Sequence, residues 1–211
     1  MQAWYRRKEL KSNRKIAFYF ETMKQNDKEQ EQEEKELAWH LKERKHLVKD
    51  QWIDLHADTF RMPDGSEVGP FYTYAKKDYC VIVARDTNGN YITVRQFRQG
   101  IQRLTTEFPA GGIEEGEDPL QAARRELQEE TGYVSDKWKQ IIAVPSDATL
   151  CENTAYIFKA DDCVPAGKQS LDRYEFMHVC TMHEDDIKEA ITQGDFAQAM
   201  HIMSFYLARE Q

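Results

Sequence analysis

The chain has 211 residues, of which 40% are hydrophobic and 31% charged, and its formal net charge is −8. This length suffices for one domain with a good core plus an appendage. The negative charge argues against a nucleic acid partner, which would require a basic surface. The sequence contains no run of 18 apolar residues and no apolar secretory signal, so we expect no membrane partner and a cytoplasmic location. The four cysteines lack CxxC spacing and are expected to be reduced.

Residues 1–45 differ in composition from the rest of the chain. The first fifteen residues are basic, and residues 27–38 (DKEQEQEEKELA) are almost all polar or charged, without Gly or Pro. We expect a charged, helical N-terminal extension over 1–45 that has almost no apolar face and is therefore solvated. The sequence leaves open whether this arm binds a partner and whether Met23 is the true start.

Residues 46–75 are predicted to form a β-hairpin ahead of the main domain, which extends over 46–211. Polar and apolar residues alternate from Trp52 to Asp58, and Pro63-Asp64-Gly65 provides a turn before residues 68–75 return. Two further strands, within residues 79–97, are joined by a tight turn at Asn88-Gly89.

The rest of the chain is organised around residues 111–133 (GGIEEGEDPLQAARRELQEETGY). Asp118 is a good N-cap and Pro119 suits the first helical position. Gly132 can take the left-handed conformation that ends a helix. These signals predict a helix from about Pro119 to about Thr131.

On this helix Glu126, Glu129 and Glu130 share one arc beside the buried stripe. Carboxylates one turn apart repel each other, and a hard divalent cation such as Mg²⁺ removes that cost. A solvated acidic face is the alternative for three Glu considered alone. The loop 109–112 adds backbone groups that can approach a ligand closely.

Residues 111–133 resemble the box of the Nudix hydrolases, G-x5-E-x7-R-E-U-x-E-E-x-G-U with U a bulky apolar residue. The matching positions are Gly111, Glu117, Arg125, Glu126, Leu127, Glu129, Glu130, Gly132 and Tyr133. The resemblance covers roughly residues 46–211 and implies a Nudix-type α/β/α sandwich with a mixed β-sheet. The sequence pattern alone supports only a mixed α/β domain.

Two segments before the box are similar to the ADP-ribose and ADP-sugar pyrophosphatase branch of that family. Val94–Arg98 (VRQFR) is similar to its V-R-Q-Y/F-R motif, in which the last Arg contacts the substrate. Arg98 suits a diphosphate because a guanidinium donates two parallel hydrogen bonds. Thr106–Gly111 (TEFPAG) resembles its E-F/L-P-A-G segment, which implies that the Ala110 carbonyl is a metal ligand. Glu107 would then lie near the metals or the terminal sugar, or be a strand-end carboxylate satisfied by a backbone amide.

The same branch implies roles for two residues outside these segments. Its N-terminal strands help form a homodimer and carry an aromatic residue that stacks on the base. Trp52 is the candidate here, with an ordinary core or interface aromatic as the alternative. Glu175, after a loop predicted over residues 161–174, matches the first Glu of an E-F-x-E-V segment, which is a catalytic base in some relatives. His178 replaces the second Glu, and a charge at a loop edge is the alternative for Glu175.

The resemblance implies a Nudix pyrophosphohydrolase that hydrolyses a nucleoside diphosphate sugar such as ADP-ribose to a nucleoside monophosphate and a sugar phosphate. Mg²⁺ is the implied cofactor, with Mn²⁺ as the other candidate. Glu126 and Glu130 are implied metal ligands, Glu129 is a ligand or the base, and Glu175 is the other candidate base.

Several alternatives remain open. ADP-ribose enzymes usually have a Pro-Gly near Ala148, which this chain lacks, so a GDP- or UDP-sugar or a damaged nucleoside triphosphate remains a possible substrate. A regulator that binds ADP-ribose without cleaving it is another alternative, although such modules tend to lose box carboxylates. An interaction protein working through residues 1–45 is the last. The chain should end in helices, and no function is assigned to His201.

Overall fold

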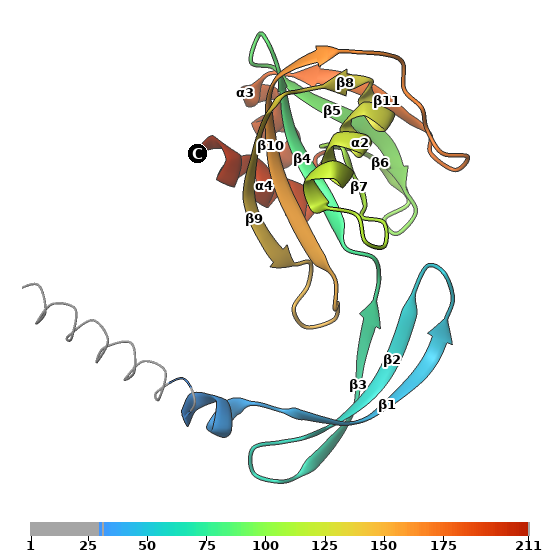
Figure 1. The fold of residues 1–211 in the computed structure, drawn as a ribbon, viewed down its shortest axis with the longest axis vertical. Coiled ribbons are helices and arrows are strands. Elements are labelled where there is room, and N and C mark those ends of the chain that lie inside the picture. Colours follow the sequence, from blue (N-terminus) through green and yellow to red (C-terminus); the bar gives the residue numbers. More distant parts are fainter. Residues whose placement is uncertain (1–29, 31, 211) are drawn as a thin grey trace, which may run out of the picture. The chain divides into compact units, whose positions relative to one another are not determined.

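The computed structural model describes residue 30 and residues 32–210. The chain divides into two compact units, one within residues 1–49 and 55–73 and the other formed by residues 50–54 and 74–211. Each unit has its own β-sheet (Figure 1). Among the described residues, no helix is long and apolar enough to cross a membrane.

The N-terminal unit is a three-stranded sheet in the order β1-β2-β3. The predicted hairpin is present as β2 (Asp54–Arg61) and β3 (Glu67–Ala75), and β1 (His40–Lys49) adds a third strand. Residues 32–37 are helical, whereas residues 1–29 of the expected extension lie outside the described residues.

The expectation of a helical extension is therefore wrong from His40 onward. Residues 40–49 (HLKERKHLVK) carry little of the apolar alternation that marks a strand, and almost all of them are exposed. An ion pair connects β1 to β2 instead: the Arg44 guanidinium donates to the buried Asp58 carboxylate at 2.9 and 2.8 Å. This pair also lowers the pKa of Asp58.

The second unit is built on an eight-stranded mixed sheet that contains the path β11-β5-β4-β10-β8. Two of its central strands, β4 (Tyr79–Asp86) and β10 (Thr154–Pro165), pair in parallel. The pairings β10–β8, β10–β9, β11–β5, β4–β5, β4–β7 and β5–β6 are antiparallel. The remaining strands are β5 (Tyr91–Arg98), β6 (Arg103–Glu107), β7 (Ala110–Gly112), β8 (Tyr133–Val134), β9 (Lys137–Pro145) and β11 (Met177–Met182).

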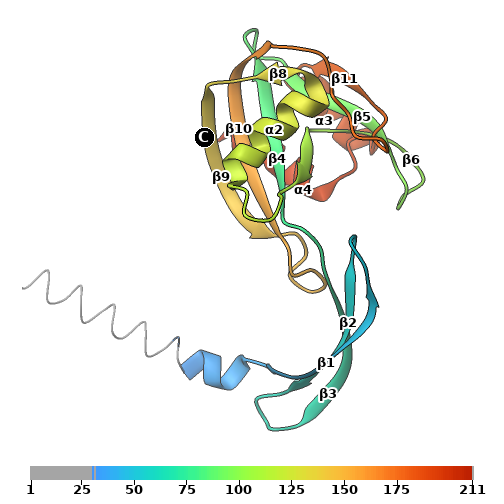
Figure 2. The ribbon, with the colours of Figure 1, turned by 45° about the vertical axis from the view of Figure 1, so that its right-hand side comes forward.

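Helices cover both faces of this sheet, as Figures 1 and 2 show. Successive residues of β4 point to opposite faces, so Val81 and Val83 pack in a core with helices α3 (Glu184–Gln193) and α4 (Ala199–Arg209). Cys80 and Ile82 belong to a second core with helix α2 (Pro119–Thr131). The predicted α/β/α sandwich with a mixed sheet is confirmed.

Helix α2 has the predicted boundaries. The Asp118 carboxylate accepts hydrogen bonds from the N–H groups of Leu120 and Gln121 at 3.0 and 3.2 Å. Gly132 ends the helix with φ 74°, in the left-handed region. These local caps fix where the acidic arc of the helix lies relative to the sheet.

Candidate active site

Arg125 connects the parts of the box. Its guanidinium donates to Glu117 at 2.9 and 3.0 Å, to Glu126 at 2.7 Å, to Glu129 at 3.1 Å and to the Gly112 carbonyl at 2.9 Å. The hydrogen bonds with Glu117, followed by those with the other carboxylates, raise the pKa of Arg125. One side chain therefore ties β7 to α2 and orients the helix carboxylates.

Gly111 leaves free the space that the Glu126 carboxylate occupies. A Cβ atom at position 111 would lie 2.0 Å from the carboxyl carbon of Glu126 and 2.2–2.3 Å from its oxygens. Such a contact is far shorter than any tolerated separation. The first glycine of the box thus leaves room for a carboxylate directly against the β7 backbone.

Two of the three helix carboxylates are buried. Glu126 is 8% exposed and Glu130 is 3% exposed, and burial raises the pKa of both. Glu130 also accepts a hydrogen bond from the Ala110 N–H at 2.9 Å. Hard oxygen atoms converge here, and their charges repel each other, so the residues fit Mg²⁺ or Mn²⁺.

Arg98 and Glu107 form one ion pair. Arg98 Nε lies 2.9 and 3.1 Å from the two Glu107 oxygens, and Nη2 lies 2.5 Å from one of them. Glu107 is fully buried. A contact from Arg98 to a diphosphate therefore has to come from its remaining N–H groups.

His201 of α4 forms a hydrogen bond with the residue that follows β6, a role that no sequence signal indicated. Its Nδ1 accepts a hydrogen bond from the Phe108 N–H at 3.1 Å, so the ring proton lies on Nε2, 4.0 Å from Glu107. Burial lowers the pKa of His201 from 6.5 to about 3. The ring stays neutral at neutral pH.

This burial predicts an acid-dependent loss of stability. Between pH 6.5 and about 3 the unfolded chain binds a proton that the folded chain does not, so the free energy of unfolding falls as the pH falls. The free energy of unfolding should change by up to about 1.4 kcal/mol per pH unit because of His201, and we expect His201→Gln to lack this contribution. Urea unfolding of both proteins at several pH values would measure it. Parallel curves for the two proteins would contradict the prediction.

The cavity beside these residues has a volume of about 900 Å³. Among the residues predicted from sequence, Trp52, Glu126, Glu129 and Glu175 line it. Trp52 is 70% exposed. The other predicted residues do not line it: Arg98 is paired with Glu107, and the Ala110 N–H is bonded to Glu130.

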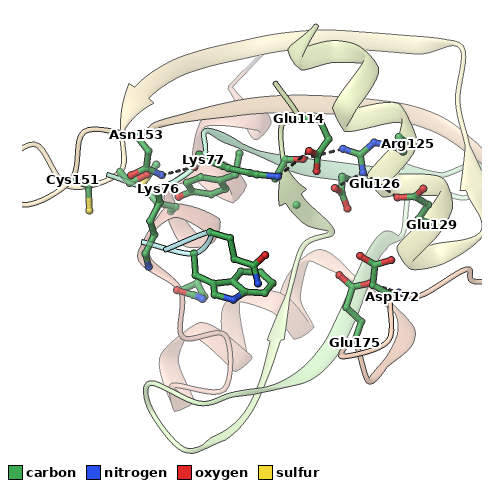
Figure 3. A pocket seen from close by; sticks show the side chains of 18 of the residues that line it. Lys76, Lys77, Glu114, Arg125, Glu126, Glu129, Cys151, Asn153, Asp172 and Glu175 are labelled. Atoms are coloured by element: carbon green, nitrogen blue, oxygen red, sulfur yellow. Dashed lines mark hydrogen bonds and ion pairs between the residues drawn. The ribbon is translucent and has the colours of Figure 1, made fainter. Parts of the chain in front are cut away.

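Figure 3 shows two groups of side chains facing this cavity. Glu126, Glu129 and Glu175 lie on one side together with Asp172. No sequence signal pointed to Asp172, or to Lys76, Cys151 and Asn153, which lie on the other side in Figure 3. Tyr74, Lys77 and Tyr79 also line the cavity and were not predicted from sequence. These residues come from strand ends and from the segments that connect the strands, and they carry no motif.

The segment before Glu175 is held by the C-terminal turn of α2. The Ser170 N–H donates to the Glu129 carbonyl at 2.8 Å, and Gln169 Nε2 donates to the Glu130 carbonyl at 2.7 Å. Such carbonyls have no partner within a helix and accept external donors. The Asp172 N–H in turn donates to the Glu175 carboxylate at 2.9 Å. The sequence predicted a loop from residue 161, but β10 continues to Pro165.

Comparisons with known proteins agree with this geometry. The family described as NUDIX domain matches residues 76–200, and the family described as nucleoside diphosphate sugar hydrolase N-terminal domain matches residues 39–74. The chain is 31% identical over 148 residues to the ADP-ribose pyrophosphatase of Bacillus subtilis (strain 168), covering 70% of this chain and 80% of that protein. It is 38% identical over 101 residues to the ADP-sugar pyrophosphatase of Mus musculus, covering 46% of each.

A solved structure described as an ADP compounds hydrolase has the same fold. It superposes with a TM-score of 0.70 at 18% identity and covers 82% of this chain and 92% of that chain. At this identity the likeness concerns the fold alone. The Nudix match, however, spans more than half of the chain and includes the complete box. The chain therefore belongs to the Nudix family, and it is a Nudix pyrophosphohydrolase.

Proposed function

We propose that this protein hydrolyses the diphosphate bond of a nucleoside diphosphate sugar such as ADP-ribose, with Mg²⁺ as its cofactor. The observation that carries the proposal is the cavity in which the carboxylates of α2 face Glu175 from another segment. The similarity to ADP-ribose and ADP-sugar pyrophosphatases supports this substrate class. So does the match of residues 39–74.

Glu126 and Glu130, with the Ala110 carbonyl, would hold the metal, and Glu129 would be a further ligand or the base. A divalent cation at this site supplies positive charge to the diphosphate and makes the attacking water more acidic. Arg125 already holds Glu126 and Glu129 in place, which reduces the reorganisation needed on binding.

Glu175 is the candidate general base that takes the proton from the attacking water. The water oxygen forms a bond to one phosphorus, and the bridging P–O bond breaks. A nucleoside monophosphate and a sugar phosphate leave, with the bridging oxygen on one of them. The Arg98 guanidinium would bind diphosphate oxygens, Glu107 would fix that guanidinium, and Trp52 would stack on the base.

A substrate screen tests this proposal. ADP-ribose, a GDP-sugar, a UDP-sugar and an oxidised nucleoside triphosphate would be incubated with Mg²⁺, and products would be separated by chromatography. We expect a monophosphate and a sugar phosphate from at least one nucleotide sugar. Turnover of the triphosphate alone would move the assignment to a different substrate class, and binding of ADP-ribose without products would indicate a regulator.

We also propose a homodimer that uses the N-terminal sheet. Leu41, Leu47, Val68 and Tyr72 on its strands are between 43% and 55% exposed, which is a large apolar area for so small a sheet. Light scattering at micromolar concentration should give twice the chain mass of 24.8 kDa. Tyr72→Glu should shift the protein toward the single-chain mass.

Tyr206→Glu is the matched control, because Tyr206 is 45% exposed on α4 of the second unit. It should leave the mass unchanged. A wild-type protein of single-chain mass would contradict the proposed dimer.

A further inference from the structure

Residues 166–175 lie against the C-terminal end of α2 before the chain reaches β11. The Gly132 carbonyl, at the C-cap of the helix, accepts hydrogen bonds from the Ala166 and Gly167 N–H groups at 2.8 and 3.2 Å. The Gly167 carbonyl oxygen lies 2.5 Å from the position that a Cβ atom on residue 132 would take. The segment is therefore packed directly on the backbone of the helix end.

Gln169 adds a side chain to this contact. Its Nε2 donates to the Glu130 carbonyl at 2.7 Å, beside the bond from the Ser170 N–H to the Glu129 carbonyl at 2.8 Å. A carbonyl can only accept, so the amide nitrogen of Gln169 has to face it. The last carbonyls of a helix have no partner within the helix, so both bonds satisfy free acceptors. The bonds from Ala166, Gly167 and Ser170 use backbone N–H groups, whereas a substitution can remove the bond from Gln169.

A turn continues from this contact to the Glu175 carboxylate. The Glu175 N–H donates to the Asp172 carbonyl at 3.0 Å. The Asp172 N–H donates to the Glu175 carboxylate at 2.9 Å. These two bonds hold the carboxylate against the backbone of its own turn. The position of the carboxylate therefore follows the position of the segment, which Gln169 and Ser170 attach to α2.

Glu175 lies close enough to the carboxylates of α2 for its charge to act on them. In Figure 3 it is on the same side of the cavity as Glu126 and Glu129. Burial raises the pKa of Glu126 and Glu130, and the negative charge of Glu175 adds to both increases. A general base has to lie within hydrogen-bond reach of the water that it deprotonates. A displaced segment would weaken that proton transfer and leave the metal ligands in place.

We propose that Gln169 is a positioning residue, whose side chain holds residues 166–175 against the end of α2 and thereby sets where the Glu175 carboxylate lies relative to the metal site. This inference rests on the proposed function, because it takes Glu175 to be the general base. Gln169 itself touches no reacting atom and acts through Glu175. Glu130 joins the two parts of the site, since its carbonyl accepts from Gln169 and its carboxylate would bind the metal.

Gln169→Met removes the donor and keeps a side chain of similar length. We expect it to lower kcat by about 10-fold with ADP-ribose, or with whichever nucleotide sugar the wild-type protein cleaves. This loss is smaller than that of the base itself, because a displaced carboxylate still accepts the proton in some turnovers. KM and the Mg²⁺ concentration for half of the maximal activity should not change. Lys168→Met is the matched control, because Lys168 is exposed on the same segment, and it should keep the wild-type kcat.

A double variant distinguishes positioning of Glu175 from a general effect on the fold. If Gln169 acts through Glu175, then Gln169→Met combined with Glu175→Gln should turn over no more slowly than Glu175→Gln alone, because no base remains to be displaced. A further loss of about 10-fold in the double variant would overturn the inference. An unchanged kcat in Gln169→Met alone would overturn it as well.

Hydrogen exchange, followed by mass spectrometry of peptides from this segment, tests the contact without relying on turnover. The N–H groups of Ser170 and Asp172 are hydrogen-bonded. They should exchange about 5-fold faster in Gln169→Met than in the wild-type protein or Lys168→Met, which corresponds to one hydrogen bond of about 1 kcal/mol. Equal exchange in all three proteins would overturn the inference, whatever their activity. A wild-type protein that cleaves no nucleotide sugar but shows the expected exchange would contradict the proposed function alone.

Discussion

Replacing Glu130 by Gln is expected to lower kcat by at least about 10²-fold while the fold is retained. A Gln side chain has the same shape, and its oxygen can still accept the hydrogen bond from the Ala110 N–H. The substitution removes the negative charge of Glu130, which is 3% exposed. The attraction between such a buried charge and a metal ion is stronger than it would be in water. Steady-state kinetics at saturating Mg²⁺, together with thermal unfolding, measure both parts of this expectation.

Gln128→Ala is the control for this experiment, because Gln128 lies on the exposed side of the same helix. It should leave kcat close to the wild-type value. Near wild-type turnover of Glu130→Gln at saturating Mg²⁺ would refute the assignment of Glu130 as a metal ligand.

The second large effect is expected at Glu175. Glu175→Gln should lower kcat by about 10²-fold with an unchanged Mg²⁺ dependence, because a general base need not bind the metal. Gln at this position can still accept the hydrogen bond from the Asp172 N–H, so the segment keeps its conformation. Glu129→Gln should instead shift the Mg²⁺ concentration that gives half of the maximal activity.

His178→Ala is the control from the adjoining strand, and it should change little because His178 is exposed. Retained activity in Glu175→Gln, combined with lost activity in Glu129→Gln at every Mg²⁺ concentration, would reverse the two roles. Measuring kcat across a Mg²⁺ titration for all three variants decides between them.

Local signals made part of this site predictable. Asp118, Pro119 and Gly132 act within a few residues of the helix ends, so α2 begins and ends where the sequence predicts. The arc of Glu126 and Glu130 then follows from helix geometry. The need for Gly111 also depends on tertiary packing, although the motif identified it, because the atom it avoids belongs to a residue fifteen positions later.

The parts that the sequence did not predict depend on contacts between distant segments. Half of the residues of β1 are charged, and its ion pair involves Asp58 on another strand. The segment before Glu175 is held by carbonyls of α2, which any donor of suitable geometry can satisfy.

The most direct measurement is a time course of ADP-ribose with the wild-type protein, with Mg²⁺ in one sample and excess EDTA in the other. Chromatography of each sample would quantify AMP and ribose 5-phosphate. The proposed function predicts that both products appear in equal amounts with Mg²⁺ and that neither appears with EDTA. Product formation that is undiminished by EDTA would contradict the proposed metal-dependent function, and intact ADP-ribose in both samples would contradict ADP-ribose as the substrate.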